Sequence, residues 1–300
     1  MNSVPLTLAR MVTTWVPDWP VLVFAAFSAF GYLRAVRRVG EWPVRRTVLF
    51  CAGLASAVLV TCSFLGAYDD VLFWARATQT VVLLMLTPLL LALGAPLTLV
   101  LAAAPGPVAA ALRRAGRGRF ARAATFPLVI TVLLIAPPFL LYLTPLYEAS
   151  LRNGAVDELV RLALVLCGFA YFWTRLRLDP TPREDHHLVS FGISFAEVVL
   201  DAGLGLVLWL GPLRAAGYYH ALGRAWGPDL RTDQIIGAGV LWIGGDLAGL
   251  PFVGALFTRW MRDDERQAER IDEELDDAPA AASGLWWESD PALAERFRRG

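Results

Sequence analysis

Three acidic residues stand within long apolar stretches of the chain, where charged side chains are otherwise rare: Glu197, Asp201 and Asp246. Glu197 and Asp201 are four residues apart, so they would share one face of a helix. An ionised carboxylate deep in an apolar layer is costly without a cation, and no arginine or histidine is predicted at that depth. The three acids are therefore predicted to line a polar cavity, either protonated or holding a proton or cation in transit. Neutral carboxyl groups hydrogen-bonded between helices are an equally good interpretation.

A second polar group lies just before an apolar stretch, at the point where that stretch would enter a membrane. Arg76, Gln79 and Thr80 would form one polar edge of a helix, shortly after a pair of aspartates. Further along the same stretch, three residues that disturb helices follow: Pro88, Gly94 and Pro96. These residues predict a kinked helix with a polar outer end.

The remaining polar residues point to structure rather than to catalysis. Asp157 and Arg161 are four residues apart and are expected to pair on one helix face. The three histidines fall in predicted loops: His186, His187 and His220. A membrane haem held by two histidines needs a pair inside the helix bundle, so this class of protein is excluded. We find no metalloprotease, P-loop or nucleophile motif, and we expect no enzymatic activity.

The composition shows which elements must position these side chains. The 300 residues are 56% hydrophobic and only 18% charged, which is too apolar for an ordinary soluble chain. Val81–Ala104 and Ala123–Tyr147 contain 24 and 25 residues without a charge, and about 20 suffice to cross a bilayer as a helix. The net charge of zero gives no general reason to expect a nucleic-acid partner, and three cysteines cannot form a disulfide scaffold. The chain is predicted to be an integral membrane protein with the bilayer as its partner.

The apolar stretches predict an all-α, polytopic membrane bundle. Backbone groups in hydrocarbon must be hydrogen-bonded within their own segment, and the alternation expected of a β-barrel is absent from the sequence. Seven spans are predicted, near Trp15–Leu33, Thr47–Leu65, Thr80–Leu101, Ala124–Leu143, Val156–Trp173, Leu188–Leu210 and Gln234–Phe257.

The arginines predict the orientation of these spans, because cytoplasmic loops retain positive charge. Seventeen arginines lie in the alternate loops after the first, third, fifth and seventh spans, and six lie on the opposite side. The N-terminus is therefore predicted to be outside the cell and the C-terminus in the cytoplasm. The positive charges of the first span follow its apolar stretch, so a cleaved signal peptide is not expected.

Two domains are predicted from the distribution of charge. Residues 1–261 would form the seven-span transmembrane domain, and residues 262–300 a charged, partly disordered cytoplasmic tail. Trp286 and Trp287 in this tail either dock on a partner or on the bilayer surface, or belong to a tail without such a role.

Two segments carry a resemblance to a known family. The first runs from Leu72 to Leu97 and includes Arg76-Ala77-Thr78-Gln79-Thr80 before the apolar helix and Leu93-Gly94-Ala95-Pro96 at its end. It resembles the CtaG-like family of cytochrome c oxidase assembly factors, whose members show a His-Met-x-Gln-His run and an apolar helix ending in Leu-Gly-x-Pro. The second segment contains Asp233, Gln234, Gly237 and Trp242, and is similar to the family's Asp-Gln, glycine and Met-Trp pattern. The similarity extends over about residues 50–270.

The resemblance implies a multi-pass protein of the bacterial plasma membrane that helps to assemble a haem-copper oxidase of the respiratory chain. Its partners would be subunits of cytochrome c oxidase, and copper would be handled at the motif histidines. In this chain Arg76 and Thr80 stand at the two histidine positions, and Asp157 and Glu158 stand where a further histidine is expected. A guanidinium group stays protonated and has no free lone pair for a metal. We therefore expect an assembly factor that has lost the copper site, with no metal or other cofactor assigned.

A transport protein is the alternative interpretation. In a proton or metal-ion channel or carrier, Glu197, Asp201 and Asp246 would conduct the ion. Neutralisation of Asp201 and Asp246 would then abolish transport while the protein still folds.

Overall fold

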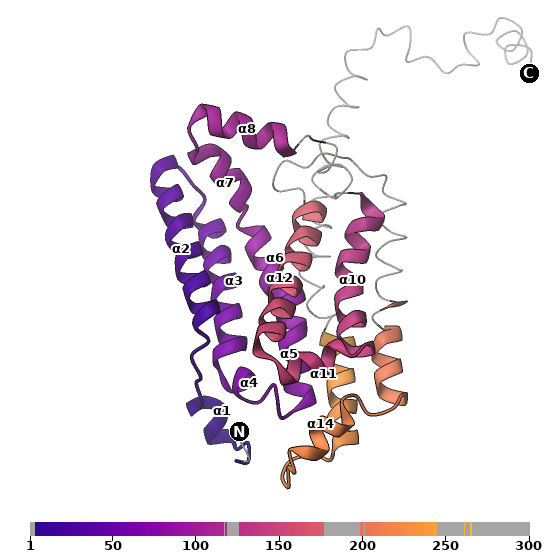
Figure 1. Ribbon diagram of the computed structural model, residues 1–300. Coiled ribbons are helices and arrows are strands. Elements are labelled where there is room, and N and C mark those ends of the chain that lie inside the picture. Colours follow the sequence, from indigo (N-terminus) through magenta and orange to yellow (C-terminus); the bar gives the residue numbers. More distant parts are fainter. Residues whose placement is uncertain are drawn as a thin grey trace, which may run out of the picture. The chain divides into compact units, whose positions relative to one another are not determined.

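The computed structural model describes residues 4–116, 118, 126–176, 199–200, 202–244, 261 and 265 (Figure 1). Regular secondary structure within these residues is helical throughout, in agreement with the predicted all-α class. The chain divides into two compact units, Met1–Phe252 and Val253–Gly300. Of the second unit only Met261 and Glu265 are described. The predicted tail from residue 262, with Trp286 and Trp287, lies outside the described residues apart from Glu265, and it stays a prediction.

The first unit is built from helices of very different length. Its helices are α1 (Leu8–Thr13), α2 (Trp19–Val39), α3 (Val44–Cys62), α4 (Phe64–Ala67), α5 (Phe73–Val81), the π-helix η1 (Val82–Leu86), α6 (Thr87–Leu93), α7 (Pro96–Ala103), α8 (Gly106–Gly116), α10 (Pro127–Leu143), α11 (Leu146–Arg152), α12 (Gly154–Leu176) and α14 (Ala216–Ala221). Residues 202–210 and 230–244 are also helical.

Local sequence explains where α2 begins and ends. The Asp18 side chain accepts a hydrogen bond from the backbone N–H of Val21 at 3.2 Å and so caps the first turn. Pro20 follows in that turn, where its missing N–H costs no hydrogen bond. Gly40 ends the helix with a positive φ of 80°, which a glycine adopts without steric cost.

The central element is a broken helix made of α5, η1, α6 and α7. The π-helix occupies Val82–Leu86, and Pro88 lies in the first turn of α6 that follows it. At the other end Gly94 closes α6, Ala95 adopts a φ of 49°, and Pro96 opens α7. The structure thus contains helix breaks at or next to Pro88, Gly94 and Pro96, the three residues that predict a kink.

Among the described residues, three helices are long and apolar enough to cross a membrane: Trp19–Val39, Val44–Ala67 and Phe73–Ala103. A fourth span is possible if Leu128–Leu143 and Leu146–Arg152, which meet at a bend of 73°, form one element. These helices correspond to the first four predicted spans. The fifth predicted span coincides with α12, which carries several charges, and the last two are described only in part. Seven spans and the orientation of the termini therefore stay predictions.

The helix Phe73–Ala103 begins seven residues before the predicted span and includes Arg76, in agreement with the predicted polar edge of a helix. Of the 18 most apolar consecutive residues of this helix, 61% are buried, against 11% for Trp19–Val39. The helix therefore lies at the centre of the packing and α2 at the edge. The helix packs on α3 and on α12. Glycines allow both approaches to be close. A Cβ atom at Gly53 of α3 would stand 2.9 Å from the Leu91 side chain, and one at Gly168 of α12 would stand 2.0 Å from the Leu84 carbonyl oxygen.

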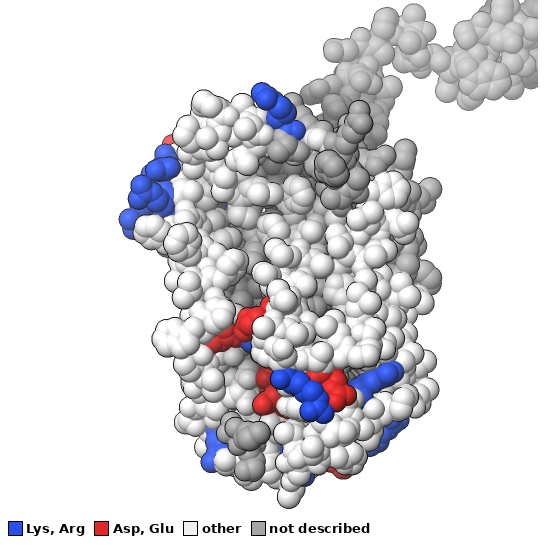
Figure 2. All heavy atoms as spheres, in the orientation of Figure 1, with Lys and Arg blue, Asp and Glu red and all other residues white. Residues whose placement is uncertain are grey.

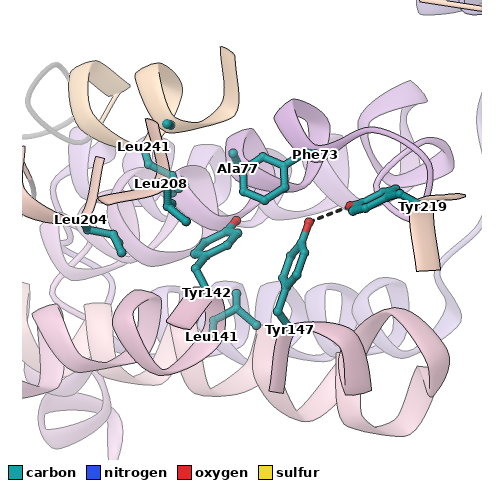
Figure 3. Close-up of a cluster of buried hydrophobic side chains, with 10 residues drawn as sticks. Phe73, Ala77, Leu141, Tyr142, Tyr147, Leu204, Leu208, Tyr219 and Leu241 are labelled. Atoms are coloured by element: carbon teal, nitrogen blue, oxygen red, sulfur yellow. Dashed lines mark hydrogen bonds between the residues drawn. The ribbon is translucent and has the colours of Figure 1, made fainter. Parts of the chain in front are cut away.

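A cluster of buried side chains joins α5 to the C-terminal helices of the first unit (Figure 3). Phe73 and Ala77 of α5 contribute to it, together with residues of α10, α11, α14 and helices 202–210 and 230–244. Within the cluster the hydroxyl groups of Tyr147 and Tyr219 are hydrogen-bonded at 2.7 Å. Burial raises the pKa of Tyr219 well above its ordinary value, so this hydroxyl stays neutral.

Candidate functional site

The side chain of Arg76 is the centre of a buried polar cluster at the start of α5. It is only 3% exposed, although it is charged. Its Nη1 donates a hydrogen bond to Asp69 at 3.1 Å, and its Nη2 donates to the Ser150 hydroxyl at 3.0 Å and to the Asp157 carboxylate. The guanidinium is therefore held between the loop before α5, α11 and the first turn of α12.

A second arginine extends this cluster into a network. Arg161 of α12 forms ion pairs of 2.7 Å with Asp69 and with Asp157, so both carboxylates are shared with Arg76. It also pairs with Asp18, the N-cap of α2, at 2.7 Å. The predicted pairing of Asp157 with Arg161 is confirmed. Glu158, 3.5 Å from Arg161, forms the exposed margin. We call these six residues the charge network: Asp18, Asp69, Arg76, Asp157, Glu158 and Arg161.

The charge network holds two arginines and four carboxylates, so acids are in excess. Burial of a charge is tolerated only when partners replace the lost hydration, and removal of one partner leaves the others uncompensated. Because the network joins α2, α5 and α12, its ion pairs also connect elements that are far apart in sequence. Figure 2 shows charged side chains gathered toward the ends of the visible face, with a largely uncharged region between them.

The other two residues of the predicted outer edge are hydrogen-bonded within the protein. The Gln79 side chain donates to the carbonyl of Val60 at 3.4 Å. Thr80 donates to the carbonyl of Arg76 and shares a hydrogen bond of 3.0 Å with the Tyr142 hydroxyl. Both side chains are buried. They fix α5 against α3 and α10 and do not extend the ion pairs of the charge network.

Asp233 supplies the N-terminal cap that α5 lacks locally. Leu72, at the capping position, has no side-chain acceptor. The two carboxylate oxygens of Asp233 accept hydrogen bonds from the backbone N–H groups of Phe73 and Trp74 at 3.2 and 3.1 Å. Arg224 pairs with the same carboxylate at 3.0 Å. Helix 230–244 thus satisfies the free donors at the start of α5 from about 160 residues away in the sequence.

Gln234 connects helix 230–244 to the end of helix 202–210. Its amide nitrogen donates to the carbonyls of Leu208 and Pro212 at 2.7 and 3.1 Å, and its oxygen accepts from the backbone N–H of Arg214 at 2.8 Å. The last carbonyls of a helix lack partners within the helix, so a buried amide is a suitable donor. Like Asp233, Gln234 acts by positioning helices.

The remaining motif residues allow helices to approach closely. A methyl group at Gly237 would overlap the ring of Phe73, and one at Gly205 would meet the Cβ atom of Trp242 at 2.9 Å. At Gly94 it would meet the Cβ atom of Phe50 at 2.7 Å. These close contacts hold helix 230–244 against α5 and helix 202–210, and the end of α6 against α3.

The carbonyl of Gly94 also connects the central helix to α2. It accepts a hydrogen bond from the Tyr32 hydroxyl at 2.8 Å, and the same hydroxyl accepts one from the Trp42 ring at 3.0 Å. Tyr32 stacks on Phe50 with ring centroids 4.0 Å apart. Tyr32 therefore connects the break before Pro96 to α2 through a hydrogen bond and to α3 through ring stacking.

The polar cavity predicted from three acids lies outside the described residues. Glu197, Asp201 and Asp246 are all in segments that the structure does not describe. Their juxtaposition stays a prediction.

The side chains around Arg76 are a poor match for copper. They are carboxylates and a hydroxyl, whereas Cu(I) prefers thiolate, thioether and imidazole ligands. Within the described part of the chain, groups of three or more histidine, cysteine or acidic side chains arranged to hold a metal ion are absent. The guanidinium of Arg76 also places a positive charge where a cation would have to bind.

Sequence reasoning identified four residues of the charge network and one of its ion pairs, but it missed the connections to Asp18 and Asp69. Arg76 and the pair Asp157 and Arg161 were identifiable from their places on helices. Asp18 reads only as an unfavourable residue at the start of the first span. The available signal was that several charges of opposite sign stand at the same predicted end of different spans.

Comparison with known proteins gives a family match. The chain matches the family described as cytochrome c oxidase caa3 assembly factor (Caa3_CtaG) over residues 29–263. It is 30% identical over 286 residues to uncharacterized proteins of Mycobacterium bovis and Mycobacterium tuberculosis, and 28% identical over 285 residues to one of Mycobacterium leprae. These alignments cover 91% of the chain but 43% of each relative, so the chain spans less than half the length of these relatives. No solved structure matches the chain significantly.

Proposed function

The chain belongs to the Caa3_CtaG family of cytochrome c oxidase assembly factors, and on this premise we propose that it assists the assembly of a haem-copper cytochrome c oxidase. It would act in the bacterial plasma membrane through contacts with oxidase subunits, as an accessory protein without turnover of its own. The family match over residues 29–263 carries this proposal, and the helices long and apolar enough to cross a membrane support it.

The proposed role is that of a scaffold that has lost the family's copper site. The motif residues Asp233 and Gly237 hold helix 230–244 against α5, and Gln234 holds it against the end of helix 202–210, which supports retention of the family's helix arrangement. At the histidine positions of the motif, Arg76 is ion-paired to two carboxylates and Thr80 is hydrogen-bonded to Tyr142. An arginine neutralised by internal partners makes the cluster stable without a metal, so copper delivery from this place is not expected.

The proposed orientation has seven spans, the N-terminus outside and the C-terminus in the cytoplasm. The C-terminal part of α2 carries Arg34, Arg37 and Arg38, the first turn of α3 carries Arg45 and Arg46, and the last turn of α8 carries Arg113 and Arg114. Figure 1 shows α8 and the C-terminal end of α2 at one end of the bundle, opposite α1, α11 and α14. Retention of positive charge would make the arginine-rich end cytoplasmic, and the charge network would then lie near the outer surface.

Deletion of the gene tests the assembly role. We expect the deletion strain to lose the haem absorption bands and the activity of its haem-copper oxidase, because an essential assembly contact is missing. A plasmid copy of the wild-type gene should restore both. Normal oxidase bands and activity in the deletion strain would refute the proposal.

Added copper tests the loss of the metal site separately. If the protein acts as a scaffold, copper in the medium should leave the deletion strain unchanged. Rescue by copper, or stoichiometric binding of Cu(I) to the purified protein, would show that metal handling persists despite Arg76.

Plasmid copies carrying Arg76→Gln and Arg152→Gln provide a matched pair, because Arg152 is an exposed arginine outside the charge network. The first should reduce oxidase content, and the second should not.

A channel or carrier remains a second candidate only because of the three acids in predicted spans. Uptake of protons or metal ions into proteoliposomes would decide it. Under this alternative, Asp201→Asn and Asp246→Asn abolish uptake while the protein folds normally. Equal ion flux with and without the wild-type protein would exclude it.

A further inference from the structure

A laterally placed apolar cavity lies beside the charge network and is not used by the proposed assembly role. Its volume is about 310 Å³. Helices α2 and α12 form its two walls, and α3, η1 and α6 form its floor. Representative lining residues are Phe24, Ala25, Leu54, Ala57, Leu91 and Leu162.

The walls of this cavity continue into the apolar outer surface of the bundle. Phe24 of α2 is 56% exposed and Leu159 of α12 is 66% exposed, although both line the cavity. Neighbouring residues on the same helices, Val23 and Leu166, are exposed as well. In a membrane this surface contacts lipid. The cavity is therefore accessible from the hydrocarbon layer and can be entered by an apolar chain.

One end of the cavity is polar and acidic. Glu158 and Arg161 line it, and the ion pair between Arg161 and Asp18 connects its two walls. Arg161 already contacts four carboxylates, of which that of Glu158 is the most exposed, with 39% of its side chain accessible. The excess of carboxylates in the charge network favours a positively charged group at this end and disfavours an anion.

The size of the cavity distinguishes between possible occupants. Ten residues of a transmembrane helix occupy roughly 1,200 Å³, taking a cylinder about 10 Å wide and about 15 Å long. A helix of a partner protein would therefore lie largely outside a cavity of about 310 Å³. A single hydrocarbon chain matches the narrow apolar space.

We propose that this cavity binds one acyl chain of a membrane phospholipid whose headgroup carries a primary amine, with the ammonium group against Glu158. The apolar walls bind the chain through close van der Waals contacts, which replace its contacts with neighbouring lipids. The Glu158 carboxylate supplies a charge-assisted hydrogen bond at the polar end. This site is independent of oxidase assembly, because it needs no client protein.

Native mass spectrometry of the purified full-length chain tests the proposal. The protein would be released from nanodiscs that contain equal amounts of phosphatidylethanolamine and phosphatidylglycerol. We expect one phosphatidylethanolamine to remain bound to the wild type. Ala57→Phe should reduce its retention at least tenfold, because the ring occupies the floor of the cavity. Ala55→Phe is the matched control, since Ala55 lies on the same helix but is exposed and does not line the cavity.

A second pair of variants tests the headgroup. Glu158→Gln should remove the preference for phosphatidylethanolamine over phosphatidylglycerol, whereas Glu148→Gln, at an exposed acid on α11, should leave it unchanged. Equal retention by wild type and Ala57→Phe, or a preference of the wild type for phosphatidylglycerol, would overturn the proposal.

Photo-crosslinking keeps the test valid if Ala57→Phe does not fold. Phosphatidylethanolamine with a photoreactive group in its acyl chain should label peptides of α3 and α12 in the wild type. Labelling spread evenly over the exposed helices would contradict a defined site.

Discussion

At the scale of single residues, Arg76 is expected to be critical for stability. Arg76→Gln leaves Asp69 and Asp157 buried with one cationic partner instead of two. Breaking a buried ion pair by removal of one partner costs about 3–5 kcal/mol. The free energy of unfolding in detergent should fall by that amount. Arg152→Gln is the control, because the Arg152 side chain is 57% exposed and its ion pair with Glu148 lies at the surface, where such a pair is worth about 1 kcal/mol or less.

A double-mutant cycle tests whether Arg76 acts through Asp157. Asp157→Asn alone should also destabilise the protein, because Arg76 and Arg161 each lose a carboxylate. Residues in one ion-pair network are coupled, so the double variant should lose less stability than the two single variants added together. Strict additivity would show that Arg76 stabilises the fold by some other contact.

At the scale of secondary-structure elements, the start of α5 depends on another helix. Asp233→Ala removes the acceptor for the backbone N–H groups of Phe73 and Trp74 and leaves Arg224 without this carboxylate. Loss of an N-cap costs about 0.5–2 kcal/mol, so amide hydrogen exchange in the first turn of α5 should accelerate by roughly one order of magnitude.

Asp229 provides the control for this effect. Its side chain accepts hydrogen bonds from the backbone N–H groups of Arg231 and Thr232 and from the Thr232 hydroxyl, which together lower its pKa. Asp229→Ala should therefore accelerate exchange at the start of helix 230–244 and leave α5 unchanged. Slow exchange of α5 in the Asp233→Ala protein would mean that packing alone holds its first turn.

Two glycines of helix 230–244 allow the packing on α5 to be tested. Gly237→Ala places a methyl group inside the ring of Phe73, and overpacking of this kind costs about 1–3 kcal/mol. Gly239→Ala meets no atom within 4 Å and should be neutral or stabilising by about 0.4–1 kcal/mol. Thermal unfolding in detergent would compare the two. Equal effects would mean that α5 and helix 230–244 are not in close contact.

At the scale of the whole molecule, the proposed orientation predicts the side on which each loop lies. A fluorescent protein that matures only in the cytoplasm should be active when fused at Glu41, between α2 and α3. Alkaline phosphatase, which requires the oxidising side, should be active when fused at Asn153 or Gly223. Activity of both reporters at one position would show mixed topology, and the reverse pattern would contradict the orientation.

Much of the fold could be predicted from local composition. The apolar stretches identified the helices at Trp19–Val39, Val44–Ala67 and Phe73–Ala103, because a membrane helix must satisfy its backbone internally and cover itself with apolar side chains. The third predicted span begins at Thr80, whereas the helix begins at Phe73 and includes the predicted polar edge with Arg76. A charged residue such as Arg76 normally ends an apolar stretch, and only its ion pairs and the cap from Asp233 allow the helix to include it.

The sequence by itself determined the helical class, the family motifs and the replacement of two motif histidines by Arg76 and Thr80, since these follow from residue types and their order. The tertiary structure decided which side chains surround the residues that replace the histidines. Asp18, Asp69 and Asp157 come from separate elements, and their approach to the two arginines depends on how those elements pack. Ion pairing acts over a few ångströms in space, whatever the distance along the chain, so the partners of a buried charge are set by packing.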